Sequence, residues 1–189
     1  NPDILGLSCS TLTFENMKTL IALARKALPH VKIMIGGPEV TSYPERSLAA
    51  TGADCAVTGE AEEVIVKVVD DLLANIKPGI VRGKSPEDLD AIPLPAIDLL
   101  EPNLTTYLGN MPRHRSPESM MLWSRGCPFN CFFCSDSVYG RQKPRYRSPH
   151  NIVEEIKRLD GLGIKEIFVY DDDLVGVTRE HTQWLESVC

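Results

Sequence analysis

Long hydrophobic runs and an excess of basic residues are both lacking in this sequence of 189 residues. Charged residues interrupt the longest apolar stretches well before the ~20 residues that a membrane-spanning helix requires, and no signal-peptide pattern opens the chain. The formal net charge of -6 argues against a general nucleic-acid binder, because such proteins carry an excess of lysine and arginine. We therefore expect no membrane span, no nucleic-acid partner and a cytoplasmic location.

The sequence also lacks the cysteine spacing that is typical of a secreted disulfide framework. Three of the six cysteines are scattered, and the other three fall within eight residues, at Cys127, Cys131 and Cys134. Soft thiolates this close together favour a soft metal centre, and an iron-sulfur cluster is one of the few that needs several of them on one loop. Three thiolates on a four-iron cluster leave one iron open, so the triad predicts chemistry as well as metal binding.

A zinc site is the main alternative to the cluster. A distant residue such as His114 or His150 would then supply the fourth ligand. Zinc ribbons and fingers usually pair two Cys-x-x-Cys knuckles, and here Cys131 and Cys134 form one. The spacing favours the cluster.

Strand and helix patterns alternate over the first 76 residues. Short apolar runs predict buried strands at residues 4–9, 31–35 and 54–57. Apolar residues at helical spacing predict helices at residues 14–28, 44–50 and 61–76. Connections of this length suit a parallel sheet, so we expect part of an open α/β domain.

Residues 77–118 lose this pattern and hold 7 of the 14 prolines, which indicates a linker between domains. A strand at residues 120–123 then leads into the cysteine loop. Ser148 as N-cap and Pro149 as first helical residue predict the next helix. A strand at residues 164–170 follows, so residues 119–189 form a second strand-helix-strand unit.

The run Ser-Arg-Gly-Cys-Pro-Phe-Asn-Cys-Phe-Phe-Cys at residues 124–134 closely resembles the signature loop of the radical S-adenosylmethionine (radical SAM) enzymes. Upstream, residues 35–39 and 53–60 resemble the cobalamin-binding domain that precedes the barrel in one large branch of that family. The resemblance implies an α/β fold with three parts. These are the C-terminal part of a Rossmann-like cobalamin-binding domain (1–76), a proline-rich linker (77–118) and the first strands and helices of a radical SAM partial (β/α) barrel (119–189).

The same resemblance implies a function. In that family, the three cysteines bind a 4Fe-4S cluster that reductively cleaves S-adenosylmethionine to a 5'-deoxyadenosyl radical. Cobalamin carries a methyl group to an unactivated carbon or phosphorus of a small-molecule substrate in many members, whereas others perform cyclisation or rearrangement. An electron donor such as flavodoxin or ferredoxin would be a partner.

The resemblance also implies particular site residues. The metal ligands are Cys127, Cys131 and Cys134; the S-adenosylmethionine contacts are Phe133, Asp172 and Asp173; and the cobalamin contacts are Ser10, Gly36, Gly37 and Glu60. Each has an ordinary structural alternative: loop packing for the phenylalanine, a turn or helix cap for each aspartate, a plain turn for the serine and glycines, and a helix start for the glutamate.

Other polar residues are interpreted as solvated. The basic run from Arg141 to Arg147 is expected on a solvated loop, and His30 and His181 at the surface. Because the chain starts at Asn1 and stops inside a predicted helix, we expect a fragment of a longer enzyme. The rival functions are a zinc-stabilised binding module and an iron-sulfur electron carrier.

Overall fold

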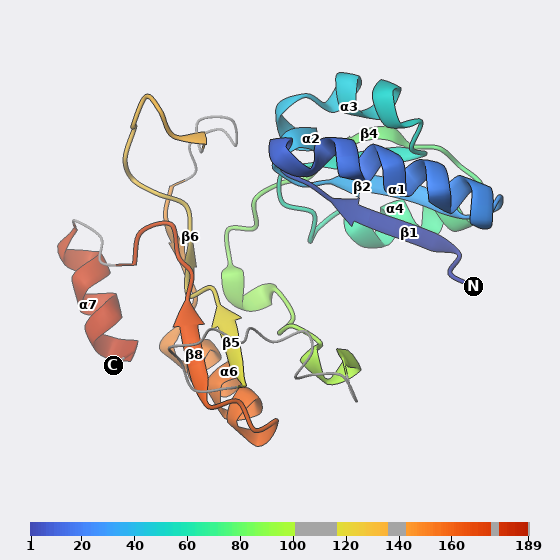
Figure 1. Ribbon diagram of the computed structural model, residues 1–189. Coiled ribbons are helices and arrows are strands. Elements are labelled where there is room, and N and C mark those ends of the chain that lie inside the picture. Colours follow the sequence, from blue (N-terminus) through green and yellow to red (C-terminus); the bar gives the residue numbers. More distant parts are fainter. Residues whose placement is uncertain (101–116, 136–142, 175–177, 189) are drawn as a thin grey trace. The chain divides into compact units, whose positions relative to one another are not determined.

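A computed structural model describes residues 1–100, 117–135, 143–174 and 178–188. The described residues divide between Pro86 and Glu87 into two compact units, each with a parallel sheet (Figure 1). The predicted α/β class is confirmed. In the described ranges, no helix is both long and apolar enough to cross a membrane.

The first unit is built on a four-stranded parallel sheet in the order β1-β2-β3-β4. Its strands are Ile4–Ser8, Lys32–Gly36, Cys55–Thr58 and Gly79–Arg82. The register pairs Leu5 with Ile33 and Ala56 with Ile80. Because all four strands run in the same direction, the turns that follow them lie along one edge of the sheet.

Helices cover both faces of this sheet, which explains why its central strands are almost wholly apolar. The helices are α1 (Phe14–Ala27), α2 (Pro38–Ser42), α3 (Pro44–Thr51) and α4 (Ile65–Leu73). Met17 and Ile21 of α1 pack against Ile33 on one face. On the other face, Val68 and Leu72 of α4 pack against Cys55 and Val57.

Two features of this unit differ from the pattern-based expectation. β4 lies within residues 77–118, where the sequence predicted a linker, because a four-residue edge strand with half-buried side chains carries little periodic signal. Regular structure therefore continues past residue 76. The helix α4 is also shorter than predicted, because it ends at Leu73, so that Ile76 lies beyond it; both residues are 53% exposed.

Asp54 joins three parts of the first unit through one buried carboxylate. Its oxygens accept hydrogen bonds from the Ile33 backbone N–H at 2.9 Å and from Arg25 at 2.7 Å, and pair with Lys77 at 2.8 Å. Burial alone would raise the pKa of Asp54, but the bonds from Lys77, Ile33 and Arg25 outweigh it and lower the pKa to about 2.

Replacing Asp54 by Asn is expected to destabilise the first unit by about 2 kcal/mol at pH 7. Because the pKa of Asp54 is lower in the folded than in the unfolded protein, its ionised form stabilises the fold at pH values above the unfolded pKa. The stability difference between the wild type and Asp54→Asn should therefore shrink as the pH drops from about 4 to about 2. Pulsed hydrogen exchange of β2 and β3 peptides in urea measures this loss. Glu15→Gln, at a carboxylate whose side chain is 78% exposed, is the control. A deficit of the same size at pH 2 would contradict the assignment.

The second unit contains the parallel pair β5 (Glu118–Met121) and β8 (Glu166–Val169), connected through α6 (Pro149–Gly161). Met121, Ile152, Leu159 and Ile164 form its buried core. Between β5 and α6 in the chain, β6 (Ser124–Arg125) pairs antiparallel with β7 (Arg145–Tyr146). The last helix, α7 (Arg179–Val188), follows β8. Two short 3-10 turns, Leu89–Ala91 and Ile97–Leu100, precede β5.

The predicted start of α6 is confirmed. The Ser148 hydroxyl accepts a hydrogen bond from the Asn151 N–H at 3.1 Å, and Pro149 is the first helical residue. This cap satisfies one of the N–H groups that a helix leaves unpaired. It also fixes the direction in which the chain leaves β7.

Candidate functional site

The residues expected to contact cobalamin gather along the edge of the first sheet where the strands end. Ser10 follows β1, Gly36 ends β2 and Gly37 follows it, and Glu60 follows β3. In open α/β sheets this edge is where ligands bind. The parallel register thus brings together four residues that are dispersed over 51 positions of sequence (10 to 60).

Gly37 is required by close packing between two turns. Its φ is +94°, and a Cβ here would lie 2.5 Å from the Ser8 Oγ and 2.8 Å from the Cys9 carbonyl oxygen. A residue with a side chain would therefore push the β2 turn away from the end of β1.

Ser10 lies at the start of a 3-10 turn, η1 (Thr11–Thr13), and is exposed. Its backbone N–H donates to the Thr13 Oγ1 at 3.1 Å. The neighbouring Leu12 is 94% exposed. The β1 turn thus presents a hydroxyl and an apolar side chain at the edge.

Glu60 lies in the loop after β3, outside the helix that it was thought able to start, because α4 begins only at Ile65. This loop presses against the end of β4. The Gly83 N–H donates to the Thr58 carbonyl at 2.8 Å, and a Cβ at Gly83 would lie 1.7 Å from the Glu60 carbonyl oxygen. The β3 and β4 turns are therefore in direct backbone contact.

Glu39 is a buried acid at this edge that the sequence reasoning did not single out. Its side chain is fully buried, accepts a hydrogen bond from the Thr11 hydroxyl at 2.6 Å and pairs with Arg46 at 3.2 Å. In the sequence, Glu39 directly follows Gly-Gly-Pro, a pattern typical of a solvated turn, so nothing local indicates that its side chain is buried. Its carboxylate links the β1 and β2 turns.

In the second unit, the cysteine loop directly follows β6. Cys127, Cys131 and Cys134 form no disulfide, Cys131 is exposed, and the Cys134 N–H donates to the Cys131 carbonyl at 3.1 Å. Across the described ranges, no three metal-binding side chains are already gathered around one point. The donor set suits an iron-sulfur cluster chemically, and the three sulfurs would have to converge as the cluster binds.

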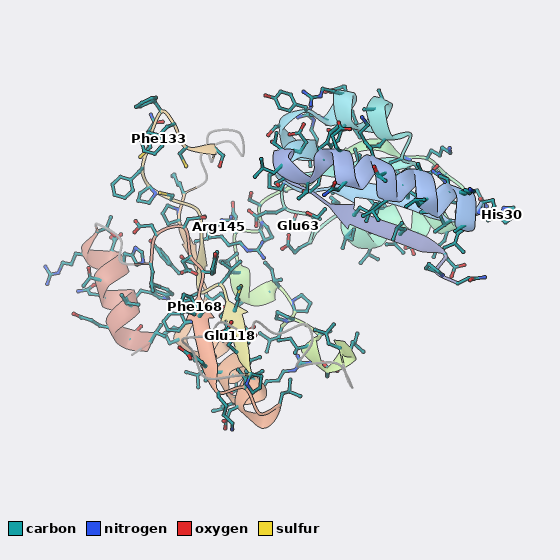
Figure 2. The ribbon with its side chains drawn as sticks, viewed as in Figure 1. His30, Glu63, Glu118, Phe133, Arg145 and Phe168 are labelled. Carbon is teal, nitrogen blue, oxygen red and sulfur yellow. The ribbon has the colours of Figure 1, made fainter. Side chains whose placement is uncertain are left out.

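Phe133 does not serve the core of the second unit. The ring is 78% exposed and meets the neighbouring Phe132 edge to face, with centroids 5.3 Å apart. Figure 2 shows Phe133 on the loop that extends beyond β6. A large apolar ring at the surface of the cysteine loop is available to stack against a flat ligand.

The three aspartates after β8 have different surroundings. Asp171 accepts hydrogen bonds from the Trp123 N–H at 2.8 Å and the Ser124 hydroxyl at 2.7 Å, which fastens the end of β8 to the start of β6. Asp172 accepts from the Gly126 N–H at 3.2 Å, one residue before Cys127. Asp171 is therefore structural, and Asp172 reaches the cysteine loop itself.

Asp173 lies close to the aromatic residues behind this edge. Burial raises the pKa of Tyr146, and the negative charges of Asp173 and Glu180 add to the increase.

The His181 ring lies 4.7 Å from Tyr146 and 5.4 Å from Trp184. His181 is only 2% exposed, so the expectation that it lies at the surface is wrong, whereas His30 is exposed as expected.

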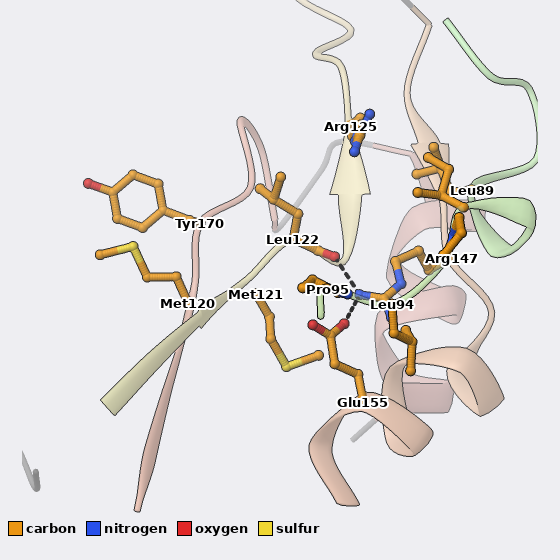
Figure 3. Close-up of a pocket in the computed structure, with 12 residues that line it drawn as sticks. Leu89, Leu94, Pro95, Met120, Met121, Leu122, Arg125, Arg147, Glu155 and Tyr170 are labelled. Atoms are coloured by element: carbon orange, nitrogen blue, oxygen red, sulfur yellow. Dashed lines mark hydrogen bonds and ion pairs between the residues drawn. The ribbon is translucent and has the colours of Figure 1, made fainter. Parts of the chain in front are cut away.

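Arg147 is also buried, against the expectation of a solvated basic run. Its side chain is 11% exposed and donates to the Glu155 carboxylate, whose side chain is 4% exposed. A second bond reaches the Leu122 carbonyl at 2.9 Å (Figure 3). The pair borders a mainly apolar cavity of about 400 Å³, whose lining includes Leu94, Met120, Met121, Arg125 and Tyr170.

Two known families match the chain, one in each unit. Residues 1–69 match the B12 binding domain and residues 121–174 match the Radical SAM superfamily. The chain belongs to the radical SAM enzymes that carry a B12-binding domain. The recognised family and its order of domains are thus as the motifs indicated.

Relatives of this radical SAM chain include named methyltransferases. An uncharacterised methyltransferase of Pyrococcus horikoshii is 32% identical over 91% of this chain and 40% of its own length. The hopanoid C-3 methylase of Methylococcus capsulatus is 32% identical over 90% of this chain and 34% of its own length. The chain therefore spans well under half of these relatives.

A solved structure shares the fold. The radical SAM methyltransferase TsrM of Kitasatospora setae, with tryptophan substrate and a SAM analogue bound, superposes with a TM-score of 0.66 at 15% identity. The match covers 98% of this chain and 39% of TsrM. Both units of the radical SAM chain therefore have the fold of their counterparts there.

Breaking the Arg147–Glu155 pair should destabilise the second unit of this radical SAM chain. Arg147→Met leaves a buried carboxylate without its cation, which costs about 3–5 kcal/mol. Both tryptophans, Trp123 and Trp184, lie in this unit, so their fluorescence in urea measures its unfolding.

The matched control is Arg158→Met, because the Arg158 side chain is 38% exposed in its pair with Asp98. An exposed pair contributes less than about 1 kcal/mol. Adding Glu155→Met to Arg147→Met should recover much of the lost stability, since no buried charge then remains. If the two arginine variants unfold at the same urea concentration, the buried pair has no special role.

Proposed function

We propose that this chain is the cofactor-binding part of a cobalamin-dependent radical SAM methyltransferase. The observation that carries the proposal is the loop after β6, which holds three cysteines outside any disulfide and is tied by Asp172 to the carboxyl end of β8. A B12-binding domain in the same chain supports methyl transfer. The names of the relatives favour it over cyclisation.

When bound, the cluster, S-adenosylmethionine and cobalamin supply radical generation and a methyl carrier for an unactivated substrate atom. The protein must bind these groups, orient them and exclude water. Cys127, Cys131 and Cys134 are the proposed cluster ligands. Three ligands leave one iron accessible to the amino and carboxylate groups of S-adenosylmethionine.

Contacts to the rest of S-adenosylmethionine are proposed for residues around this loop. The exposed ring of Phe133 would pack against the adenine. Asp172 and Asp173, just beyond β8, would accept hydrogen bonds from the N–H groups of its amino nitrogen, because a bond to an ionised carboxylate is roughly twice as strong as a neutral one. Both aspartates act as binding groups in this proposal.

Cobalamin contacts are proposed for the edge of the first sheet. The Gly36–Gly37 turn would lie against the bulky cofactor, and the Ser10 hydroxyl would bond to its nucleotide base. Glu60 lies on the adjacent turn and would contact the same ligand. The substrate is proposed to be a small molecule.

An electron must also reach the cluster, so a one-electron donor such as flavodoxin or ferredoxin is the proposed partner. Five described cysteines are free thiols. Free thiols and a metal loop suit a reducing compartment, and we propose the cytoplasm.

Anaerobic reconstitution tests the metal assignment. About four iron and four sulfide per chain are expected, as a 4Fe-4S cluster requires. Replacing any one of Cys127, Cys131 and Cys134 by Ser should remove most of both, whereas Cys9→Ser, outside the loop, should not. Stoichiometric zinc without sulfide would instead indicate the zinc-stabilised binding module.

The two adjacent phenylalanines provide a matched test of S-adenosylmethionine binding. Phe133→Ala should weaken binding to the reconstituted protein about tenfold, since a stacked ring contributes about 1 kcal/mol or more. Phe132→Ala, which removes a ring that is 97% exposed, should change the Kd little. Isothermal titration gives both values, and the change in the cluster's electron paramagnetic resonance spectrum on adding S-adenosylmethionine confirms the site. An intact cluster whose spectrum ignores S-adenosylmethionine would favour an electron carrier.

A further inference from the structure

Glu39 is a buried carboxylate between two turns at the carboxyl edge of the first sheet. Its backbone N–H donates to the Cys9 carbonyl at 3.2 Å, and its side chain accepts from Thr11 at 2.6 Å and from Arg46 at 3.2 Å. The residue itself is 1% exposed. Contacts to residues 9 and 11 therefore come from both the backbone and the side chain of one residue.

Burying this charge is costly, and packing does not require it. An ionised carboxylate taken out of water loses several kcal/mol unless it is well paired. The paired Arg46 side chain is 62% exposed and also lies over the Tyr43 ring at 5.1 Å. Such a solvated partner compensates only in part, so the carboxylate has a role beyond filling space.

The turn that Glu39 holds is anchored at its two ends by the buried residues Cys9 and Phe14. None of the residues Thr11–Thr13 is buried, and Leu12 is 94% exposed. Local bonds from the backbone and hydroxyl of Ser10 to Thr13 shape the turn but do not attach it to the sheet. The Thr11–Glu39 bond connects it to a residue 28 positions away.

Both turns carry proposed cobalamin contacts. Ser10 precedes Thr11, and Gly37 lies two residues before Glu39. A shift of either turn would move the Ser10 hydroxyl away from Gly36 and Gly37. Ligand affinity is higher when such groups are held in place before binding.

We propose that Glu39 is a positioning residue for cobalamin. Its carboxylate holds the Thr11 turn against the Gly37 turn, so that Ser10, Leu12 and the two glycines form one preordered cradle for the nucleotide tail of the corrinoid. This inference rests on the proposed function, and goes beyond it by assigning the cradle's order to one buried acid.

The experiment compares Glu39→Gln and Thr11→Val with the wild type in the full chain. Hydroxocobalamin binding by equilibrium dialysis should weaken about tenfold in each variant, the loss of one charge-assisted hydrogen bond. A glutamine oxygen can still accept from Thr11 but carries no charge, so the double variant should be about as weak as Thr11→Val alone. The matched control is Glu45→Gln, at an exposed acid of α3, which should bind as the wild type does.

Hydrogen exchange without cobalamin supplies a second readout. Peptides spanning residues 10–13 should exchange faster in both variants, while β2 peptides remain protected. Thr11→Val alters an exposed residue, so it tests the bond even if Glu39→Gln does not fold.

Three results would overturn the inference: unchanged exchange at residues 10–13, wild-type affinity in both variants, or losses that add in the double variant. A folded wild type that binds no hydroxocobalamin would instead refute the proposed cobalamin function. The exchange at residues 10–13 would still decide whether Glu39 orders the turn.

Discussion

The parallel direction of the strands is the constraint on which the rest of this molecule depends. Because β1 to β4 run the same way, every turn that follows a strand lies at one edge, and the same holds for the turns after β5 and β8. Residues far apart in sequence are thereby brought to one edge, as Ser10 and Glu60 are, or into direct contact, as Gly126 and Asp172 are. Each unit thus gathers its polar groups at one end of its sheet, where α/β and barrel proteins place their sites.

Adjacent turns along these edges are fastened to each other by polar side chains. Glu39 joins the first two turns of the first unit, and Thr41 accepts the Gly59 N–H at 3.1 Å to join the second to the third. In the second unit, Asp171 and Asp172 do the same for the end of β8 and the start of the cysteine loop. Exposed ligand-binding groups are thereby mounted on turns that are themselves held to a rigid sheet.

Sequence patterns predicted what depends on neighbours in the chain. The Ser148 cap and the helix after Thr13 follow local rules and lie where expected. β4 was missed because its support comes from pairing with β3. Likewise, Arg147 and His181 carry no local sign of burial. The burial of Arg147 arises from its pair with Glu155 of α6, and that of His181 from the rings of Tyr146 and Trp184. The motif identified the cysteines, but spacing alone does not say how far apart the three sulfurs lie.

That separation of the cysteine sulfurs has a thermodynamic consequence. Since no metal-binding group is preassembled in the described residues, ordering the loop and loading the cluster are linked steps of one equilibrium. Part of the free energy of coordination offsets the conformational entropy that the cysteine loop loses on ordering. A contact that already orders this loop therefore raises the apparent affinity for the cluster. The Asp172 carboxylate on the Gly126 N–H is already such a contact. In the proposed function, cluster retention therefore depends on the turn after β8 that carries Asp172 as well as on the three proposed cysteine ligands.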